Sequence, residues 1–252
     1  MNRREFLKAV PAVAALTAAA SSLAEDVAPT PGTRDTAATT PGAGTGLEPV
    51  ALPPPQADGG KSVLAALWER KTLRSISDRK LPPQVLSNLL WAAWGVNRKA
   101  GPSRRAGRTA ASASNSQEMD LYVVLPEGVY LYEAEPHRLA PILAGDHRAT
   151  VRRRRRRAGA EAPVILVFVA DVAKYANGRP QEPGLRDEEI RKSYYNVATG
   201  LIAANVYLFA ASQGLGAWFH NCNKPALAGL LKLRPEQHVL YAQTVGYPVA
   251  GA

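Results

Sequence analysis

The sequence predicts an α+β domain in which helices flank a mainly antiparallel sheet. Two kinds of pattern support this fold class. Apolar residues recur at helical spacing in several segments, whereas other segments have the composition of strands, two of which are joined by a short hairpin turn. Helical and strand-like segments are mixed along the chain, and the sequence contains no internal repeat.

Two helices are expected at the start of the domain. Residues 62–70 have the pattern of a short amphipathic helix, and the polar, basic residues 71–79 are expected to be extended. The Leu-Pro-Pro string at 81–83 opens a second helix, because proline is tolerated in the first helical turn. Its apolar residues keep helical spacing as far as Gly95, which we expect to end the helix.

The middle of the chain is expected to supply most of the strands. Residues 97–118 are polar, with scattered glycine and serine, which predicts a structured loop. Residues 120–125 and 128–133 predict a β-hairpin, and residues 137–143 predict a short helix. Residues 163–170 form a continuous apolar run, which is typical of a strand buried on both faces.

The longest helical pattern covers residues 190–213. It is apolar nearly all round and ends at Gly214, so we expect this helix to be central in the domain. Residues 238–247 predict the last strand. The residues expected to line one face of the long helix are Val197, Leu201, Ala204, Leu208 and Ala211.

The first 60 residues are not expected to belong to the folded domain. Residues 1–24 have a charged start, an alanine-rich apolar middle and a small-residue exit, and Arg3-Arg4 closely matches a twin-arginine export signal. Residues 25–60 are rich in Pro, Ala, Gly and Thr, which predicts a disordered linker. We therefore expect export to the periplasm and one domain over residues 61–252.

Composition excludes several classes of site. Part of the formal net charge of +10 lies in the run Arg152 to Arg157, which has no interleaved aromatic residues. We interpret this run as a solvated loop insertion and expect no nucleic-acid partner. The single cysteine, Cys222, excludes an internal disulfide, and the scattered histidines lack ligand spacing, so no metal site is predicted.

The sequence contains no nucleophile elbow, no GxxxxGKS/T phosphate loop and no GxGxxG after a strand. A bound cofactor is therefore expected to carry the chemistry. Arg70, Thr72 and Arg74 alternate on an extended segment, so two guanidiniums and a hydroxyl could converge on a phosphate dianion. A solvated basic surface is the alternative interpretation.

Two further segments are consistent with contacts to a flat flavin ring. Residues 111–117 are small and polar, and their Asn and Gln side chains can both donate and accept hydrogen bonds; a capped turn is the alternative. The glycines of Gly214-Leu215-Gly216 would let the backbone approach a flat ligand, or would cap the helix. His220 and Cys222 follow, for which a structural histidine and a buried thiol are the alternatives.

Taken in order, these segments resemble the nitroreductase family. The resemblance covers nearly all of residues 61–248, and the ordered set is far more specific than any single member of it. It is closest to the compact members, including those similar to azoline-oxidising dehydrogenases. The matching stretches are ERKTLRSISDRKLPPQVLSNLLWAAWGVNR, GRTAASASNSQEMDLYVVLPEGVYLYE, LAGDHRA, APVILVFVAD, GLIAANVYLFAASQGLG and AQTVGYP.

The resemblance implies an α+β homodimer that binds FMN at the subunit interface. The basic segment would hold the phosphate and ribityl chain, the serine- and asparagine-rich loop would contact the flavin, and the segment after GLG would lie over the ring. The cofactor-binding residues carried over in this way are Arg70, Lys71, Thr72 and Arg74, then Ser112, Asn115 and Gln117, and finally Gly214, Gly216, His220, Asn221 and Cys222.

The implied function is an FMN-dependent oxidoreductase that exchanges electrons with a small organic substrate by a ping-pong mechanism. Departures from the family pattern at residues 71–73 and 220–222 motivate a second hypothesis, a degenerate member that binds a ligand or partner without redox turnover. NADPH and NADH are not expected in the periplasm. We therefore predict that a quinol, a redox partner or the organic substrate itself reduces the flavin.

Overall fold

A computed structural model describes residues 46–100, 105–152, 161–177 and 183–251. The predicted signal peptide lies outside the described residues, as do the linker up to residue 45 and the arginines at 153–157.

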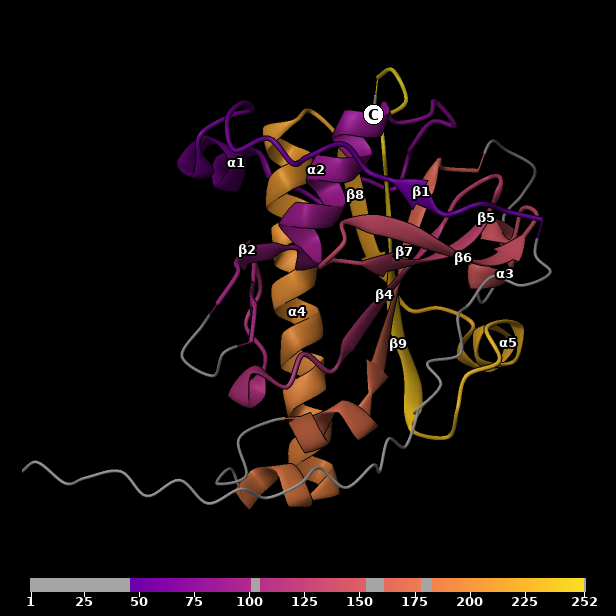
Figure 1. The fold of residues 1–252 in the computed structure, drawn as a ribbon. Helices are drawn as coiled ribbons and strands as arrows, with labels where there is room; N and C mark the ends of the chain where they lie inside the picture. Colours follow the sequence, from indigo (N-terminus) through magenta and orange to yellow (C-terminus); the bar gives the residue numbers. More distant parts are fainter. Residues whose placement is uncertain (1–45, 101–104, 153–160, 178–182, 252) are drawn as a thin grey trace, which may run out of the picture. The chain divides into compact units, whose positions relative to one another are not determined.

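The described residues contain one seven-stranded sheet, in which every pair of neighbouring strands is antiparallel. Its strands are β1 (Val50–Ala51), β4 (Met119–Val124), β5 (Gly128–Glu133), β6 (Arg138–Ala144), β7 (Val164–Asp171), β8 (Gly216–His220) and β9 (Gln237–Gly246). They are arranged in the order β1-β6-β5-β4-β7-β9-β8 (Figure 1). A separate two-stranded sheet joins β2 (Val96–Arg98) to β3 (Gly107–Arg108).

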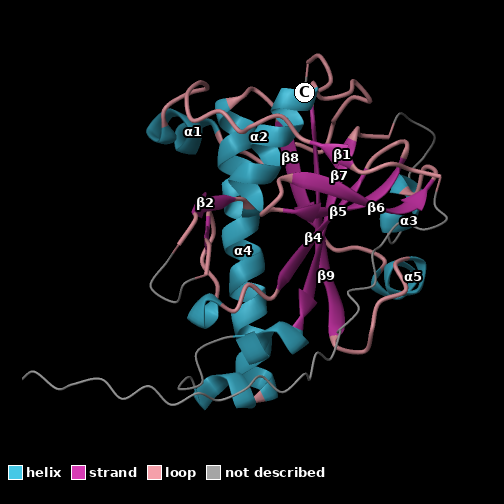
Figure 2. Ribbon diagram, viewed as in Figure 1, coloured by secondary structure: helices cyan, strands magenta, loops and turns pink. Residues whose placement is uncertain are grey.

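Helices cover both faces of this sheet (Figure 2). The α-helices are α1 (Val63–Glu69), α2 (Pro83–Trp94), α3 (Arg148–Val151), α4 (Glu188–Ser212) and α5 (Lys224–Leu230), and shorter 3-10 turns lie at Ala113–Asn115, Val172–Asn177 and Pro183–Arg186. Helices α2 and α4 contribute to one hydrophobic core, and α3 and α5 contribute to the other. None of the described helices combines the length and the apolar character needed to cross a membrane.

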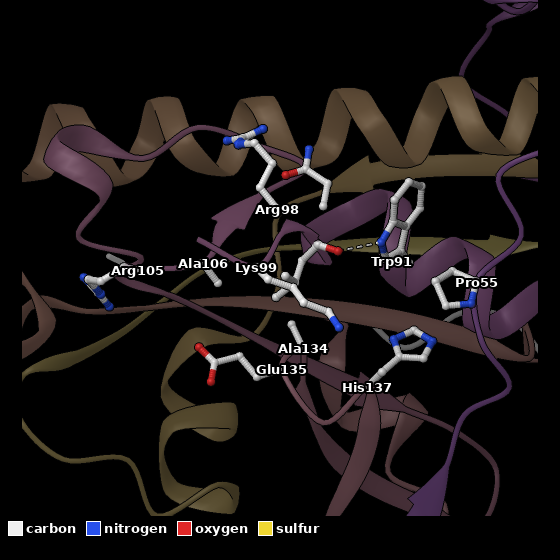
Figure 3. Close-up of a pocket in the computed structure, with 11 residues that line it drawn as sticks. Pro55, Trp91, Arg98, Lys99, Arg105, Ala106, Ala134, Glu135 and His137 are labelled. Carbon is white, nitrogen blue, oxygen red and sulfur yellow. Dashed lines mark hydrogen bonds between the residues drawn. The ribbon is translucent and has the colours of Figure 1, made fainter. Parts of the chain in front are cut away.

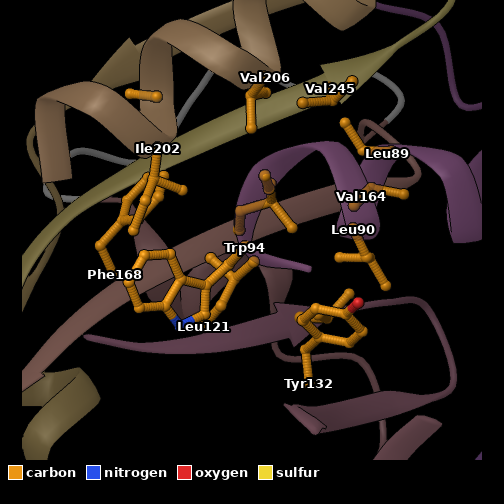
Figure 4. Close-up of a cluster of buried hydrophobic side chains, with 14 of the residues drawn as sticks. Leu89, Leu90, Trp94, Leu121, Tyr132, Val164, Phe168, Ile202, Val206 and Val245 are labelled. Atoms are coloured by element: carbon orange, nitrogen blue, oxygen red, sulfur yellow. The ribbon is translucent and has the colours of Figure 1, made fainter. Parts of the chain in front are cut away.

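The sheet separates these two cores, and its interior strand β7 contributes to both. Its alternate residues Leu166 and Phe168 face the α2/α4 core, whereas Ile165 and Val167 face the α3/α5 core. All four side chains are fully buried, as predicted for the apolar run at 163–170. Each such burial stabilises the fold by roughly 1.5–3 kcal/mol. Figure 4 shows Phe168 among the large side chains of the α2/α4 core, including Leu90, Trp94, Leu121, Ile202 and Val206.

The predicted helices at 62–70, 81–95 and 190–213 and the strands at 120–125, 128–133, 163–170 and 238–247 are confirmed. Local caps explain several of the helix boundaries. The Ser62 side chain accepts a hydrogen bond from the backbone N–H of Ala65 at the start of α1, and the Asp187 side chain accepts one from Ile190 at the start of α4. Proline occupies the first turn of α2, where it costs no hydrogen bond.

The predicted helix at 137–143 is wrong, because these residues belong to strand β6. The strand lies between β1 and β5, so its backbone groups are satisfied by two neighbours rather than by one helical turn. Pro141 would also break a helix, since it has no N–H. Within the sheet it lies opposite Tyr130, where the register shifts between Val129 and Tyr130, as expected for a proline inside a sheet.

The face predicted for the long helix is also wrong. Val197, Leu201 and Ala204 are exposed, and the buried face is rotated around the helix axis relative to the predicted one. Because the helix is apolar nearly all round, its sequence pattern does not show which face is buried. The face that packs against the sheet carries small residues, which permit close packing. The Gln243 side chain on β9 donates to the backbone oxygen of Ala203. The buried residues of α4 are Ala198, Thr199, Ile202, Ala203, Val206 and Ala210.

Residues 46–60, expected as the end of a disordered linker, are instead packed against the domain. Strand β1 pairs with β6, and the Gln56 backbone N–H donates to Asn88 Oδ1 at 2.9 Å. The Gln84 side chain donates to the Pro54 carbonyl oxygen at 2.9 Å. We call residues 50–60 the N-terminal strap, because they run across the start of α2.

Candidate cofactor site

Five residues from three elements form an aromatic–basic cluster: Arg70, Thr72, Arg74, Tyr207 and Trp218. The Arg70 guanidinium carbon lies 5.5 Å from the centre of the Tyr207 ring, and that of Arg74 lies 5.7 Å from the Trp218 ring. The Thr72 and Tyr207 hydroxyls are 3.1 Å apart. The first and third predicted segments therefore meet, with α4 contributing the tyrosine.

The basic segment is held along the edge of the sheet by β8. The Leu73 backbone N–H donates to the Ala217 carbonyl oxygen at 3.0 Å, and Thr72 forms an isolated parallel bridge with Ala217. Tyr207 joins the two, because its hydroxyl also accepts a hydrogen bond from the Phe219 N–H at 2.9 Å. This edge pairing fixes the backbone from which Arg70 and Arg74 project.

A pair of glycines allows the basic segment to pack closely against the sheet. Gly216 on β8 lies opposite Gly246 on β9. A Cβ atom at Gly246 would lie 2.7 Å from Ile76 and 2.8 Å from Pro163, and one at Gly216 would lie 3.2 Å from Leu73. Gly216 is thus required for close packing of the basic segment, and its missing side chain opens no space for a ligand.

The charges of the cluster are uncompensated within the described part of the chain. Neither Arg70 nor Arg74 has an acidic partner there, and the nearby Glu69 carboxylate pairs with Lys61. Two permanent cations and a hydroxyl are donors suited to a phosphate dianion, and two aromatic rings lie beside them. The residues present therefore fit the phosphate end of a phosphorylated aromatic cofactor.

Lys71 and Leu73 line a small cavity of about 140 Å³, together with Glu69, Gly214, Pro248 and the cluster residue Tyr207. Alternation along the extended segment explains this, because neighbouring side chains point in opposite directions.

The second predicted segment forms a tightly bonded loop of its own. Gln117 is buried, its Nε2 donates to the Ala106 oxygen at 2.7 Å, and its Oε1 accepts from Arg108 at 2.7 Å. The Ser112 hydroxyl accepts from the Gln117 N–H at 3.0 Å. The hydrogen bonds of Ser112 and Gln117 all stay within residues 106–117, so this loop makes its contacts apart from the aromatic–basic cluster.

The same loop is conformationally strained. Ser114, Asn115 and Gln117 adopt φ values of 51°, 53° and 54°, in the left-handed region that residues with a Cβ avoid. Such strain costs on the order of 1–3 kcal/mol per residue and concentrates at functional sites. The surrounding hydrogen bonds, including those from Arg105 to the backbone oxygens of Asn115 and Ser116, hold the loop in this shape.

The third predicted segment is divided between several roles. Gly214 has φ of +67° and caps α4, while the Leu215 N–H donates to the Ala210 oxygen at 2.8 Å. His220 Nε2 lies 2.9 Å from the Thr244 hydroxyl, Nδ1 lies 2.8 Å from the Asn221 oxygen, and the ring lies beside that of Trp218. Burial lowers the pKa of His220, so the ring is neutral near pH 7.

The side chains of Asn221 and Cys222 have other partners. The Asn221 side-chain oxygen accepts from the Cys222 N–H, and the Cys222 side chain is buried in the α3/α5 core. Burial raises the pKa of the Cys222 thiol to about 11, which keeps it protonated. Cys222 is therefore a small buried hydrophobic residue in this structure, the alternative that its apolar character allowed.

Sequence reasoning missed Tyr207, Trp218 and Arg108. Tyr207 could have been found as the tyrosine that interrupts the apolar pattern near the end of the long helix, and Trp218 as the first aromatic residue after the GLG string. The Arg108 guanidinium lies 5.5 Å from the Trp94 ring, and burial lowers its pKa. Only the fold reveals that Arg108 supports Gln117.

Comparison with known proteins identifies the family to which this site belongs. The sequence model of the nitroreductase family matches residues 67–247. The chain belongs to the nitroreductase family. Membership of this family makes the chain an oxidoreductase.

Individual nitroreductases agree with this assignment. A crystal structure of a nitroreductase from Ralstonia eutropha JMP134 is 33% identical, covers 83% of this chain and 94% of its own, and superposes with a TM-score of 0.70. A nitroreductase of Methanocaldococcus jannaschii is 29% identical over 158 residues, which are 60% of this chain and 73% of the relative. A structure from Anabaena variabilis, 15% identical with a TM-score of 0.56 over 74% of this chain and 38% of its own, shares the fold.

Proposed function

We propose that this nitroreductase binds FMN and transfers electrons to or from a small organic substrate by a ping-pong mechanism. The observation that carries this proposal is the aromatic–basic cluster, in which Arg70, Arg74 and Thr72 present donors for a phosphate beside Tyr207 and Trp218. FMN would supply the redox chemistry when bound.

The chain's own residues then have binding and positioning roles. The two guanidiniums would hold the phosphate, and the pairing of Leu73 with Ala217 fixes the backbone that carries them. His220 is neutral and engaged with Thr244, so it positions its neighbour Trp218 rather than moving protons. No side chain is assigned as proton donor, since solvent protons suffice for an open redox site.

A homodimer is part of the proposal. Val197 and Leu201 on α4 are 61% and 42% exposed, and Leu64 and Trp68 on α1 are 78% and 92% exposed. Large apolar side chains of this exposure on two packed helices favour a protein partner. The separate hydrogen bonds of Ser112 and Gln117 agree with a site completed by a second subunit, because the hydrogen bonds of these two side chains stay within residues 106–117.

A specific observation also supports the second hypothesis, a family member without redox turnover. Cys222 is buried and Gly216 is closely packed, so two of the residues expected to approach the ring are occupied by core packing. This hypothesis predicts a folded protein with weak or absent flavin binding.

Flavin titration separates the two functions. Purified full-length protein should be yellow, with about one FMN per subunit, and flavin-free protein should recover the cofactor on titration. The bound flavin should then be reduced and reoxidised in separate half-reactions, as a ping-pong mechanism requires. Colourless protein that stays folded and cannot be reconstituted would establish the ligand-binding alternative instead.

A further inference from the structure

A second pocket, apart from the aromatic–basic cluster, opens between the N-terminal strap, α2 and the β2–β3 hairpin. Its volume is about 710 Å³, within the range of small-molecule sites. Figure 3 shows Lys99 extending towards His137, with Trp91 and Pro55 on the same side and Arg105 and Glu135 on the other. We call this cavity the hairpin pocket.

The apolar walls of the hairpin pocket are fixed by hydrogen bonds. The Trp91 indole N–H donates to the Val96 oxygen at 3.0 Å, which holds the ring in one orientation. The strap residue Pro55 lies between Pro54, whose carbonyl accepts from Gln84, and Gln56, whose N–H donates to Asn88. An aromatic face and a proline ring are thus in place before any ligand arrives.

His137 completes the wall without adding charge. Its Nδ1 accepts from the Tyr132 hydroxyl at 2.9 Å, and its Nε2–H is directed at the Pro53 carbonyl oxygen and the Ser87 hydroxyl. Burial lowers the pKa of His137, so the ring is neutral near pH 7. Because both ring nitrogens already have partners within the protein, the imidazole needs none from a ligand.

The charge of the pocket is positive. Arg98, Lys99 and Arg105 line it, against the single carboxylate of Glu135. Neither Arg98 nor Lys99 has an acidic partner within the described ranges. The Arg105 guanidinium donates to the backbone oxygen of Asn115 at 2.8 Å, which fixes its place.

We propose that the hairpin pocket binds a small aromatic carboxylate. The ring would lie against Trp91 and Pro55, and the carboxylate would be bound by Lys99, which extends to the same side of the pocket. A monoanion fits better than a phosphate dianion, because Glu135 lines the same pocket and repels added negative charge. The proposal is independent of flavin binding, since none of these residues belongs to the aromatic–basic cluster.

The test compares two ligands that differ only in charge, 2-naphthoate and 2-naphthamide. Isothermal titration of the full-length protein at low salt should give at least about tenfold tighter binding of the carboxylate, the value of one charge-assisted contact. Lys99→Gln should remove most of this preference, and added salt should reduce it. Lys80→Gln, which removes an exposed cation outside the pocket, is the matched control and should leave it unchanged.

Trp91→Leu separates the aromatic wall from the charge, because it should weaken the binding of both ligands equally. The FMN content of Lys99→Gln should equal that of wild type. The pocket can therefore be tested separately from flavin binding. Equal affinities for naphthoate and naphthamide, or a preference that survives Lys99→Gln with the variant folded by circular dichroism, would overturn it.

Discussion

Arg70 and Arg74 present their charges from the edge of the sheet beside aromatic rings, and this arrangement predicts their effect on flavin binding. Replacing either by Gln removes one charge-assisted contact to the phosphate, which costs about 2 kcal/mol, or roughly a thirtyfold loss of FMN affinity. Fluorescence titration of flavin-free protein with FMN measures this affinity. Arg79→Gln is the matched control, since Arg79 also lies over a ring, that of Tyr247, at 4.1 Å. Unchanged affinity in both Arg70→Gln and Arg74→Gln would place the phosphate elsewhere.

Glu118 predicts a pH dependence of stability. It is fully buried beneath the strained loop, where Ser116 donates to its carboxyl group, and burial raises its pKa. A pKa that is higher in the folded than in the unfolded state contributes stability at low pH that is lost as the pH rises through the folded value. Glu118→Gln should therefore gain more stability over wild type at pH 8 than at pH 5, as measured by urea unfolding. Glu127→Gln, an exposed carboxylate, should show no such difference.

At the scale of single residues, the sequence predicted which side chains could bind a phosphate better than it predicted which residues surround them. Arg70, Thr72 and Arg74 were found because alternation on an extended segment is a local property. Their partners Tyr207 and Trp218 were not, because they depend on the pairing of residue 217 with residue 72, far apart in the chain. Cys222 was assigned to the cofactor by its position after GLG, yet it lies beyond the end of β8 and packs into the α3/α5 core.

At the scale of elements, the Gly216–Gly246 pair couples the sheet to the basic segment. A methyl group at Gly246 would press on Ile76 and Pro163, and overpacking of this kind costs roughly 1–3 kcal/mol. Gly246→Ala should thus lower the free energy of unfolding and also weaken FMN binding, because Ile76 positions the segment that carries Arg74. Gly229→Ala is the control: a Cβ there meets nothing within 4 Å, and alanine in α5 should be neutral or slightly stabilising. Equal effects of the two substitutions would contradict the role of Gly246 in the close packing of the basic segment.

Helices and strands that are marked by a clear local sequence pattern were predicted correctly. Those that depend on pairing or packing with distant parts of the chain were not. The apolar run of β7 and the proline start of α2 are properties of the chain itself. Strand β6 forms because it pairs with β1 on one side and β5 on the other. Its short sequence has no clear two-residue alternation of apolar and polar residues that would have predicted a strand. For α4, the helix was predicted but its buried face was not, since small residues on the opposite side allowed the closer approach to β9.

At the scale of the whole molecule, the apolar residues exposed on α4 predict the oligomeric state. Val197→Asp with Leu201→Asp should convert a homodimer to monomers, because two charges would be buried without partners at the interface. Sedimentation equilibrium measures the change, and the fold should survive because both side chains are exposed in the single chain. Val249→Asp removes an equally exposed apolar residue elsewhere and should leave the dimer intact. A wild-type protein that is monomeric at micromolar concentration would refute the dimer.

The last prediction joins the export signal to the electron donor. Arg3-Arg4 matches the twin-arginine export signal, so we predict export by that pathway. The pathway carries folded proteins and would preserve a cofactor acquired in the cytoplasm. The periplasm is not expected to hold NADPH or NADH, so the physiological reductant should be a quinol, a redox partner or the organic substrate. Changing Arg3-Arg4 to Lys-Lys should retain the protein in the cytoplasm on fractionation, and stopped-flow mixing should show slow flavin reduction by NADPH. Rapid reduction at micromolar NADPH, or a cytoplasmic location with both arginines intact, would defeat this prediction and leave the flavin assignment standing.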